Sequence, residues 1–325
     1  MRRLSYSLGS LLSIEEVLEC SQKLNEIKPE VEWIPETWGM ENFSMLGLAS
    51  KKNTFSKIGS SIINIYSRSP SLIAMGASTV DTISNGRLIL GLGTSSVPIV
   101  ENFHGNSFDS PVQRMKEYVE IIRLALQGGK INYSGKLFTL KEFSLLTKPF
   151  RKEIPIYLAA INQKMVEMTW DIADGVIFYL RPKSEMKETI SKMQKKKKID
   201  TTLQIITCVN EDDEKARTRA KKTLSFYIAV GKIYREFLES KGYSEEVQHI
   251  YEEYKKTGLN KLQEFVPERM LDDLCIAGTP DIAVKRLNEF RGIGIDLPII
   301  QFNPIGNVKE SFELLTKTFA GELNE

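Results

Sequence analysis

Short apolar segments alternate with amphipathic ones along the whole chain. Eight segments have the length and apolar content of strands and are bounded by Pro, Gly or charge, at 4–9, 31–36, 57–65, 87–93, 153–160, 173–180, 203–209 and 297–303. Helical patterns separate or follow them, at 14–27, 44–52, 69–86, 111–126, 163–172, 183–195, 279–291 and 307–319. This strand–helix alternation favours a parallel sheet that is covered by helices on both faces.

Local signals mark the starts of two of these helices. Ser13, with Glu16 three residues later, has the spacing of a capping box and predicts a helix that begins at residue 14. Ser69 followed by Pro70 predicts an N-cap and a first helical residue, and Asn85-Gly86 predicts the end of that helix.

The number of strands predicts the fold class. Eight strand–helix units within one domain of this length favour a (β/α)8 TIM barrel in the α/β class over an open sheet. The alternating segment 130–140 predicts a β-hairpin around Ser134-Gly135. The polar stretch 211–276 is too long for a simple crossover, so we interpret it as a helical insertion between strands seven and eight. We therefore expect one domain over 1–325.

Composition excludes several classes of protein. The 325 residues include 44 Lys plus Arg and 42 Asp plus Glu, a formal net charge of +2, and 42% are hydrophobic. This balance is unlike that of disordered chains and disulfide scaffolds, and it argues against a nucleic-acid partner. No apolar run approaches the roughly 20 residues that cross a bilayer, and the first residues lack the apolar stretch of a signal peptide. We expect a cytoplasmic protein with no membrane partner.

Cysteine and histidine usage bears on metal binding. The three cysteines, Cys20, Cys208 and Cys275, form no CxxC pair, and we interpret them as buried apolar thiols. Only two histidines occur, His104 and His249, which makes a polyhistidine centre impossible. We therefore expect no metal site.

A Gly-x-Gly pair follows the fourth strand. A dinucleotide fingerprint would require a third glycine at position 96, where Ser96 stands, and a helix that begins at once. The spacing of Gly91 and Gly93 agrees equally well with two roles. These glycines allow a ligand to approach the backbone at the strand end, or they serve the geometry of a turn.

Polar groups stand at the carboxyl ends of the predicted strands, where barrel enzymes hold their ligands. They are Ser7, Glu36, Ser61, Asn64, Thr94, Ser95, Asn162 and Asn303, with Ala160 and Ile161 beside them. Glu36 is either a general base or an ion-paired loop residue, and for any single position a structural role is favoured. As a set, hydroxyl and amide groups suit a polar ring and a phosphate better than a metal. The loop 160–163 precedes a helix whose free N–H groups can hold an anion.

Three blocks of the sequence resemble a known family. They are IYSRSPSLIAMGASTVDTISNGRLILGLGTSS (65–96), VENFHGNSFDSPVQRMKEYVEIIR (100–123) and IPIYLAAINQKMVEMTWDIADGVIF (154–178). In this order they resemble the bacterial-luciferase-like superfamily of FMN- or coenzyme F-420-dependent enzymes. The nearest branch is the deazaflavin-dependent group that includes the methylenetetrahydromethanopterin reductase-like proteins.

The resemblance implies a (β/α)8 barrel that binds FMN or F-420 at its C-terminal mouth, often as a homodimer. In the family a non-proline cis peptide in strand three backs the ring, and Ser61–Ile62 is the matching position, with Asn64 beside it. The loop after strand four corresponds to Gly93, Thr94 and Ser95. The phosphate loop corresponds to Ala160, Ile161, Asn162 and Gln163, and Ser7 completes the implied cofactor-binding residues.

The chain departs from the family at the positions of proton transfer. Many relatives have a histidine after the strand-two acid, where this chain has Thr37 and Trp38. Some deazaflavin dehydrogenases have a carboxylate beyond the strand-four glycines, where Ser95 and Ser96 stand. Glu36 and Glu101 are the candidate catalytic residues that remain.

The resemblance implies an oxidoreductase that moves a hydride between coenzyme F-420 and a small organic substrate. The close alternative is an FMN-dependent monooxygenase that incorporates molecular oxygen. Two other classes stay open from the residues alone. A two-carboxylate glycosidase needs a second strand-end acid opposite Glu36, and a barrel without catalytic activity stays open because a fold does not determine function.

Overall fold

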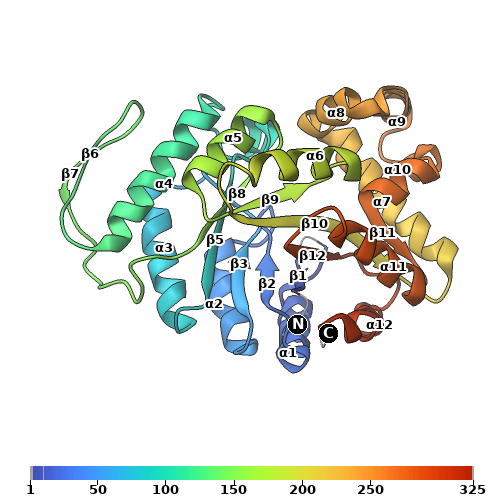
Figure 1. The fold of residues 1–325 in the computed structure, drawn as a ribbon, viewed down its shortest axis with the longest axis horizontal. Coiled ribbons are helices and arrows are strands. Elements are labelled where there is room, and N and C mark those ends of the chain that lie inside the picture. Colours follow the sequence, from blue (N-terminus) through green and yellow to red (C-terminus); the bar gives the residue numbers. More distant parts are fainter. Residues whose placement is uncertain (1–2, 10, 324–325) are drawn as a thin grey trace. The chain divides into compact units, whose positions relative to one another are not determined.

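A computed structural model describes residues 3–9 and 11–323 of the chain (Figure 1). It contains two compact units. The first unit comprises Leu8–Ile177, and the second comprises Met1–Ser7 together with Phe178–Glu325. Each unit contains parallel strands.

The sheet of the first unit has the strand order β2–β3–β5–β8–β9. Its strands are β2 (Val31–Ile34), β3 (Lys57–Ser60), β4 (Ile63–Asn64), β5 (Leu88–Gly93), β8 (Ile156–Ala159) and β9 (Gly175–Tyr179). All these neighbours pair in parallel, and β4 pairs with the end of β5. Every residue of β5 is buried, as expected for a strand covered on both faces.

Helices follow the strands of the first unit. They are α1 (Ile14–Ile27), α2 (Asn42–Lys52), α3 (Pro70–Ile83), the π-helix η1 (Ile99–Phe103), α4 (Pro111–Gln127) and α5 (Gln163–Ile172). The predicted capping box of α1 is confirmed, since the Glu16 N–H donates to Ser13 Oγ and the Ser13 N–H donates to Glu16 Oε2. Ser69 caps α3 and Pro70 is its first residue, as predicted. The sequence pattern did not predict η1.

An antiparallel pair projects beside α4 (Figure 1). It consists of β6 (Ile131–Ser134) and β7 (Thr139–Phe143), and it covers the range 130–140 of the predicted hairpin. The Glu117 carboxylate of α4 accepts the backbone N–H groups of Lys136, Leu137 and Phe138 in the turn. This buried carboxylate therefore ties the hairpin to the helix.

The sheet of the second unit has the order β11–β10–β12–β1. Its strands are β1 (Ser5–Ser7), β10 (Asp200–Val209), β11 (Cys275–Gly278) and β12 (Leu297–Phe302), all paired in parallel. The eight predicted strand segments are all present as strands. The predicted strand 57–65 is divided into β3 and β4, and β11 was not predicted because it is four residues long and directly follows an acidic helix.

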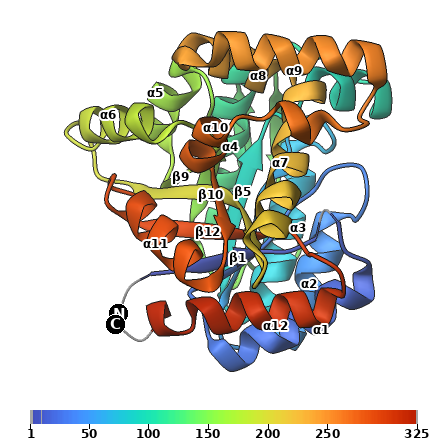
Figure 2. The same cartoon turned by 90° about the vertical axis from the view of Figure 1, so that its right-hand side faces the viewer.

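Most of the range 211–276 is helical and belongs to the second unit (Figure 2). They are α6 (Lys183–Met193), α7 (Asp213–Val230), α8 (Lys232–Leu238), η2 (Glu239–Tyr243), α9 (Ser244–Thr257), η3 (Leu262–Phe265), α10 (Glu268–Leu274), α11 (Pro280–Arg291), α12 (Val308–Phe319) and η4 (Gly321–Leu323). The buried faces of α7, α9 and α10 share one apolar cluster with β10 and β11, which includes Cys208 and Cys275. All three cysteines are buried and unbridged, as predicted.

The contact between β3 and β5 leaves no room for a side chain at residue 91 of β5. A Cβ atom at Gly91 would lie 1.8 Å from the Ser60 carbonyl oxygen. Gly91 exchanges two hydrogen bonds with the Ser60 hydroxyl, which donates to the Gly91 carbonyl over 2.9 Å and accepts the Gly91 N–H over 2.8 Å. The chain therefore needs a glycine here because two strands approach closely.

We predict that Gly91→Ala lowers the free energy of unfolding by about 3 kcal/mol, because the added methyl group can be accommodated only by moving backbone. Gly47→Ala is the matched control. A Cβ at Gly47 in α2 meets no atom within 4 Å, and alanine favours the helix by about 1 kcal/mol. Urea denaturation measures both changes, and equal stability of the two variants contradicts the role of the close strand contact.

Glu32 on β2 is a fully buried carboxyl group. The Asn53 amide donates to Glu32 Oε2 over 2.9 Å, and Ser21 Oγ lies in a short contact with Oε1. Ser21 also donates to the Val17 carbonyl, so its oxygen can accept a proton from a neutral Glu32. Burial raises the pKa of Glu32 to about 7, because the charged form loses its hydration.

This shift gives a pH dependence of stability. The pKa of a glutamate in the unfolded chain is about 4.3, so the folded chain binds the extra proton between that pH and about 7. We predict that the free energy of unfolding falls as the pH rises through this window. Glu32→Gln, which mimics the neutral acid, should lose this component. Denaturation of the wild type and of Glu32→Gln from pH 5 to pH 8 tests this prediction. If the free energies of unfolding of the two proteins change in parallel with pH, the prediction is contradicted.

Candidate functional site

A two-residue break, Ser61 and Ile62, separates β3 from β4, and both strands pair in parallel with β5. The peptide bond between Ser61 and Ile62 is cis, which confirms the position implied by the resemblance. Ser61 donates its N–H to the Ile34 carbonyl of β2, and beyond β4 the Ile65 N–H donates to the Gly93 carbonyl of β5. The segment is thus fastened to the ends of both neighbouring strands.

Gly93 forms a cradle at the end of β5. A Cβ atom there would lie 2.5 Å from the side chain of Ile62 and 3.4 Å from the Cβ of Ala159 on β8. Three strand ends therefore meet at this glycine. Of the sequence-predicted residues, the structure brings Ser61, Ile62, Asn64 and Gly93 together.

Two polar atoms beside this cradle have no partner. Ser61 Oγ and Asn64 Nδ2 are buried, and neither makes a hydrogen bond within residues 3–9 and 11–323. The Asn64 side chain is oriented nonetheless, because its Oδ1 accepts the Tyr66 N–H over 2.9 Å. Buried donors are rarely left unpaired in native proteins. A ligand with polar groups on the edge of a ring fits this place, since it can satisfy both atoms.

Glu36, the strand-two acid, is held by an arginine. Arg68 Nη2 lies 2.6 Å from Glu36 Oε1 and Nη1 lies 2.8 Å from Oε2, and both side chains are about one-tenth exposed (13% and 9%). The N–H groups of Asn42 and Asn64 also donate to this carboxylate. Arg68 contacts Glu41 as well. The sequence left two interpretations open for Glu36, a general base or an ion-paired loop residue. This geometry agrees with the ion-paired residue.

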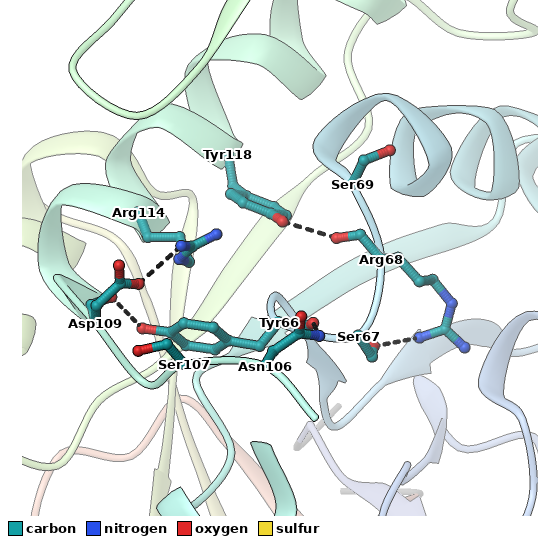
Figure 3. Close-up of a pocket in the computed structure, with 9 residues that line it drawn as sticks. All are labelled: Tyr66, Ser67, Arg68, Ser69, Asn106, Ser107, Asp109, Arg114 and Tyr118. Carbon is teal, nitrogen blue, oxygen red and sulfur yellow. Dashed lines mark hydrogen bonds and ion pairs between the residues drawn. The ribbon is translucent and has the colours of Figure 1, made fainter. Parts of the chain in front are cut away.

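A polar cleft of about 330 Å³ opens on the other side of the segment that carries Arg68 (Figure 3). The Tyr118 hydroxyl donates to the Arg68 carbonyl, and the Tyr66 hydroxyl donates to the Asp109 carbonyl over 2.6 Å. Burial raises the pKa of Tyr66 to about 12, so this hydroxyl keeps its proton at neutral pH. Arg114 pairs with the Asp109 carboxylate and lies over the Tyr66 ring. The two arginines of the cleft are thus already neutralised by carboxylates.

The loop after β5 contains the remaining carboxylate candidate. Thr94 and Ser95 are partly exposed, and Ser95 adopts a left-handed conformation with φ of 58°. Glu101 follows on the π-helix η1, is exposed, and accepts one N–H, from Phe108 over 3.3 Å. Unlike Glu36, Glu101 therefore has no cation holding its carboxylate in the described part of the chain.

The predicted phosphate loop leads into α5. Ala160 is buried and donates its N–H to the Ile177 carbonyl, and Ile161 is partly exposed. Asn162 caps α5, where its Oδ1 accepts the Met165 N–H, and Gln163 begins the helix. The helix start carries the positive end of the α5 dipole.

Some residues of the site were not predicted from the sequence, and one predicted residue lies in the other unit. Ser7 belongs to the second unit, where it is buried on β1 and pairs in register with Gln301 of β12. Arg68 and Tyr66 were not singled out, although both lie in the run Tyr-Ser-Arg-Ser-Pro within a block that resembles the family. Their contacts join loops far apart in the chain, which no local pattern shows.

The described residues offer neither a metal centre nor a membrane span. No group of three or more His, Cys, Asp or Glu side chains among residues 3–9 and 11–323 is placed to hold a metal ion. Over the same residues, no helix combines the length and apolar character needed to span a membrane.

The carboxyl ends of parallel strands, where this buried polar cradle lies, are the place at which α/β enzymes bind their ligands. The chain matches the solved structure of the coenzyme F420 dependent tetrahydromethanopterin reductase from Methanopyrus kandleri with a TM-score of 0.87, at 21% identity and 99% coverage of both chains. The fold is therefore the predicted (β/α)8 TIM barrel. The chain belongs to the luciferase-like monooxygenase family, whose sequence profile matches residues 3–297, and it is an oxidoreductase of that family.

Two further proteins show where in the family the similarity lies. A 5,10-methylenetetrahydromethanopterin reductase from Archaeoglobus fulgidus is 30% identical over 306 residues, which are 90% of each chain. An F420-dependent secondary alcohol dehydrogenase, solved with an F420–acetone adduct, has a TM-score of 0.79 at 16% identity and 98% coverage of both chains. The resemblance to the luciferase-like superfamily is confirmed.

We predict that Arg68→Met costs about 3 kcal/mol of stability, because it leaves the Glu36 carboxylate buried without its cation. Adding Glu36→Gln should recover part of this loss, giving a coupling energy of about 1–3 kcal/mol in a double-mutant cycle. The exposed Lys23–Glu26 pair, with side chains 39% and 61% exposed, is the control and should show at most about 0.5 kcal/mol. Equal coupling in the two cycles, measured by urea denaturation, contradicts the assignment.

Proposed function

We propose that the chain transfers a hydride between coenzyme F-420 and a small organic substrate, as a methylenetetrahydromethanopterin reductase-like enzyme. The observation that carries the proposal is the pair of unpartnered buried atoms, Ser61 Oγ and Asn64 Nδ2, beside the Gly93 cradle. The names of the Archaeoglobus fulgidus relative and of the Methanopyrus kandleri structure support the choice of reaction and cofactor.

In this proposal the deazaflavin ring is held by Ser61, Ile62, Asn64, Gly93, Thr94 and Ser95. Its phosphate is held by Ala160, Ile161, Asn162 and Gln163, where the N-terminus of α5 favours an anion. The cofactor supplies the hydride chemistry, and the chain supplies binding, orientation and exclusion of water. The apolar Ile62 side chain lies against the glycine of β5, so it can support a flat ring from behind.

The two carboxylate candidates take different roles. Arg68 and two backbone N–H groups occupy the lone pairs of Glu36, so we assign Glu36 to positioning the loop that carries Asn64. Glu101 is exposed and accepts a single long hydrogen bond, so its carboxylate is available to hold or release a proton. Glu101 is therefore the proposed proton-transfer residue, and Glu36 a residue that acts through Asn64.

The alternative is an FMN-dependent luciferase-like monooxygenase. The matched family is named for that activity, and the same cradle accepts the ring of FMN. The cofactor decides between the two functions, so binding is the first measurement.

We predict that the purified protein binds F-420 at least about tenfold more tightly than FMN, a difference of about 1.4 kcal/mol, in separate fluorescence titrations. Tighter binding of FMN supports the monooxygenase. Binding of neither cofactor contradicts both functions.

Ser61→Leu tests the placement of the ring. A leucine side chain would fill the space beside the unpartnered atoms, so we expect cofactor affinity to fall by about a hundredfold, or about 2.7 kcal/mol, with the fold retained by circular dichroism. Ser191→Leu, at an exposed position of α6, is the matched control and should bind as the wild type does. Unchanged affinity in Ser61→Leu contradicts the placement.

We also propose that the protein is a homodimer that pairs through α2 and α3. These adjacent helices expose Leu48, Leu72 and Met75, which are 50%, 48% and 53% accessible. We predict that light scattering gives twice the chain mass of 36.9 kDa, and that Leu72→Glu with Met75→Glu reduces it to the monomer. A monomeric wild type contradicts this proposal.

A further inference from the structure

A second hollow lies in the second unit, along α7. It has a volume of about 620 Å³, and one wall is formed by Lys215, Thr218, Arg219 and Lys222. These positions are spaced by three, four and seven residues, so they form one stripe on the helix. The opposite wall includes 304–306, the loop after β12, and Gln263. We call this hollow the α7 groove.

The α7 groove lies at the functional end of the sheet. Its helix begins four residues after β10 ends at Val209, and its facing loop begins two residues after β12 ends at Phe302. The two strands are parallel and paired up to Thr207 and Phe302, so the groove stands at their carboxyl ends. This is the end at which α/β barrels bind their ligands.

Some of the charged side chains that line the groove form ion pairs and others do not. Asp212 and Glu214 are its acidic members, and Asp212 is occupied by capping α7 and by an ion pair with Lys215 over 3.4 Å. Arg219 and Lys222 have no carboxylate partner within the residues that the structure describes. The groove therefore presents two unneutralised cations on successive turns of one helix.

Arg219 is held in place by neutral groups. Its Nε donates to the Pro304 carbonyl over 3.1 Å and its Nη1 donates to Thr223 Oγ1 over 2.6 Å. Thr223 in turn contacts Asn303 Oδ1, at the end of β12, over 3.1 Å. These contacts orient the guanidinium without cancelling its charge, and an oriented guanidinium binds carboxylate or phosphate oxygens in a defined geometry.

We propose that the α7 groove binds a chain of negatively charged groups, carboxylates or phosphates, on a small molecule. Arg219 and Lys222 bind successive anionic groups, and the Thr218 hydroxyl donates to the oxygens between them. A small polyanionic metabolite has this chemistry, and its binding does not rest on the proposed function.

The experiment compares two variants with equal loss of charge. Arg219→Gln with Lys222→Gln removes the unpaired cations of the groove. Lys195→Gln with Lys196→Gln removes two lysines from the exposed basic run that follows α6, which lines neither described hollow. Calorimetric titration with tri-γ-glutamate and with inorganic pyrophosphate at low salt measures the affinity of each protein for a polyanion.

We expect the groove variant to lose about tenfold or more in affinity for either probe, and the control variant to change less than about twofold. Equal losses in the two variants overturn the proposal, because binding then follows net charge alone. Absence of probe binding by the wild type at millimolar concentration also overturns it.

Discussion

The site depends on the close approach of β3 to β5. The Ser60 carbonyl lies where a side chain at residue 91 would begin, and the Ser60 hydroxyl bonds to both backbone groups of Gly91. Because this contact brings the two strands together, the chain beyond Ser60 can turn and lay Ile62 over the second glycine, Gly93. The cradle, and the polar atoms beside it, follow from the absence of two side chains on one strand.

Three buried or nearly buried carboxyl groups of the first unit have specific partners. Glu36 has its arginine and two backbone donors, Glu117 accepts the turn of the hairpin, and Glu32 is neutralised by taking up a proton as burial raises its pKa to about 7. Ser61 Oγ and Asn64 Nδ2 are among the buried side-chain atoms that make no hydrogen bond within the described residues, and these two lie beside the Gly93 cradle. An unsatisfied donor at a strand end is costly for folding, and it becomes useful when a ligand supplies the missing acceptor.

The two units differ in the chemistry that they offer to ligands. In the first unit, the arginines of the polar cleft are paired with carboxylates, and the Gly93 cradle is lined by Ile62 and Ala159. The second unit has the α7 groove, where Arg219 is oriented by a carbonyl and a hydroxyl and keeps its charge. The net charge of +2 does not show this difference between the units, because the unpaired cations lie together in the α7 groove.

The sequence by itself determined the elements: all eight strand segments, the capping box at Ser13, the start of α3 at Ser69, and, through its resemblance to a family, the cis bond at Ser61–Ile62. These features depend on residues close together in the chain, whose periodicity and capping chemistry are local. Only the tertiary structure decided what each polar residue does. Glu36 is ion-paired because Arg68 reaches it from 32 residues away, and the Arg219 guanidinium is oriented because a loop 85 residues later offers it a carbonyl oxygen. A side chain's chemistry follows from its partners, and partners so distant in sequence are brought together by packing alone.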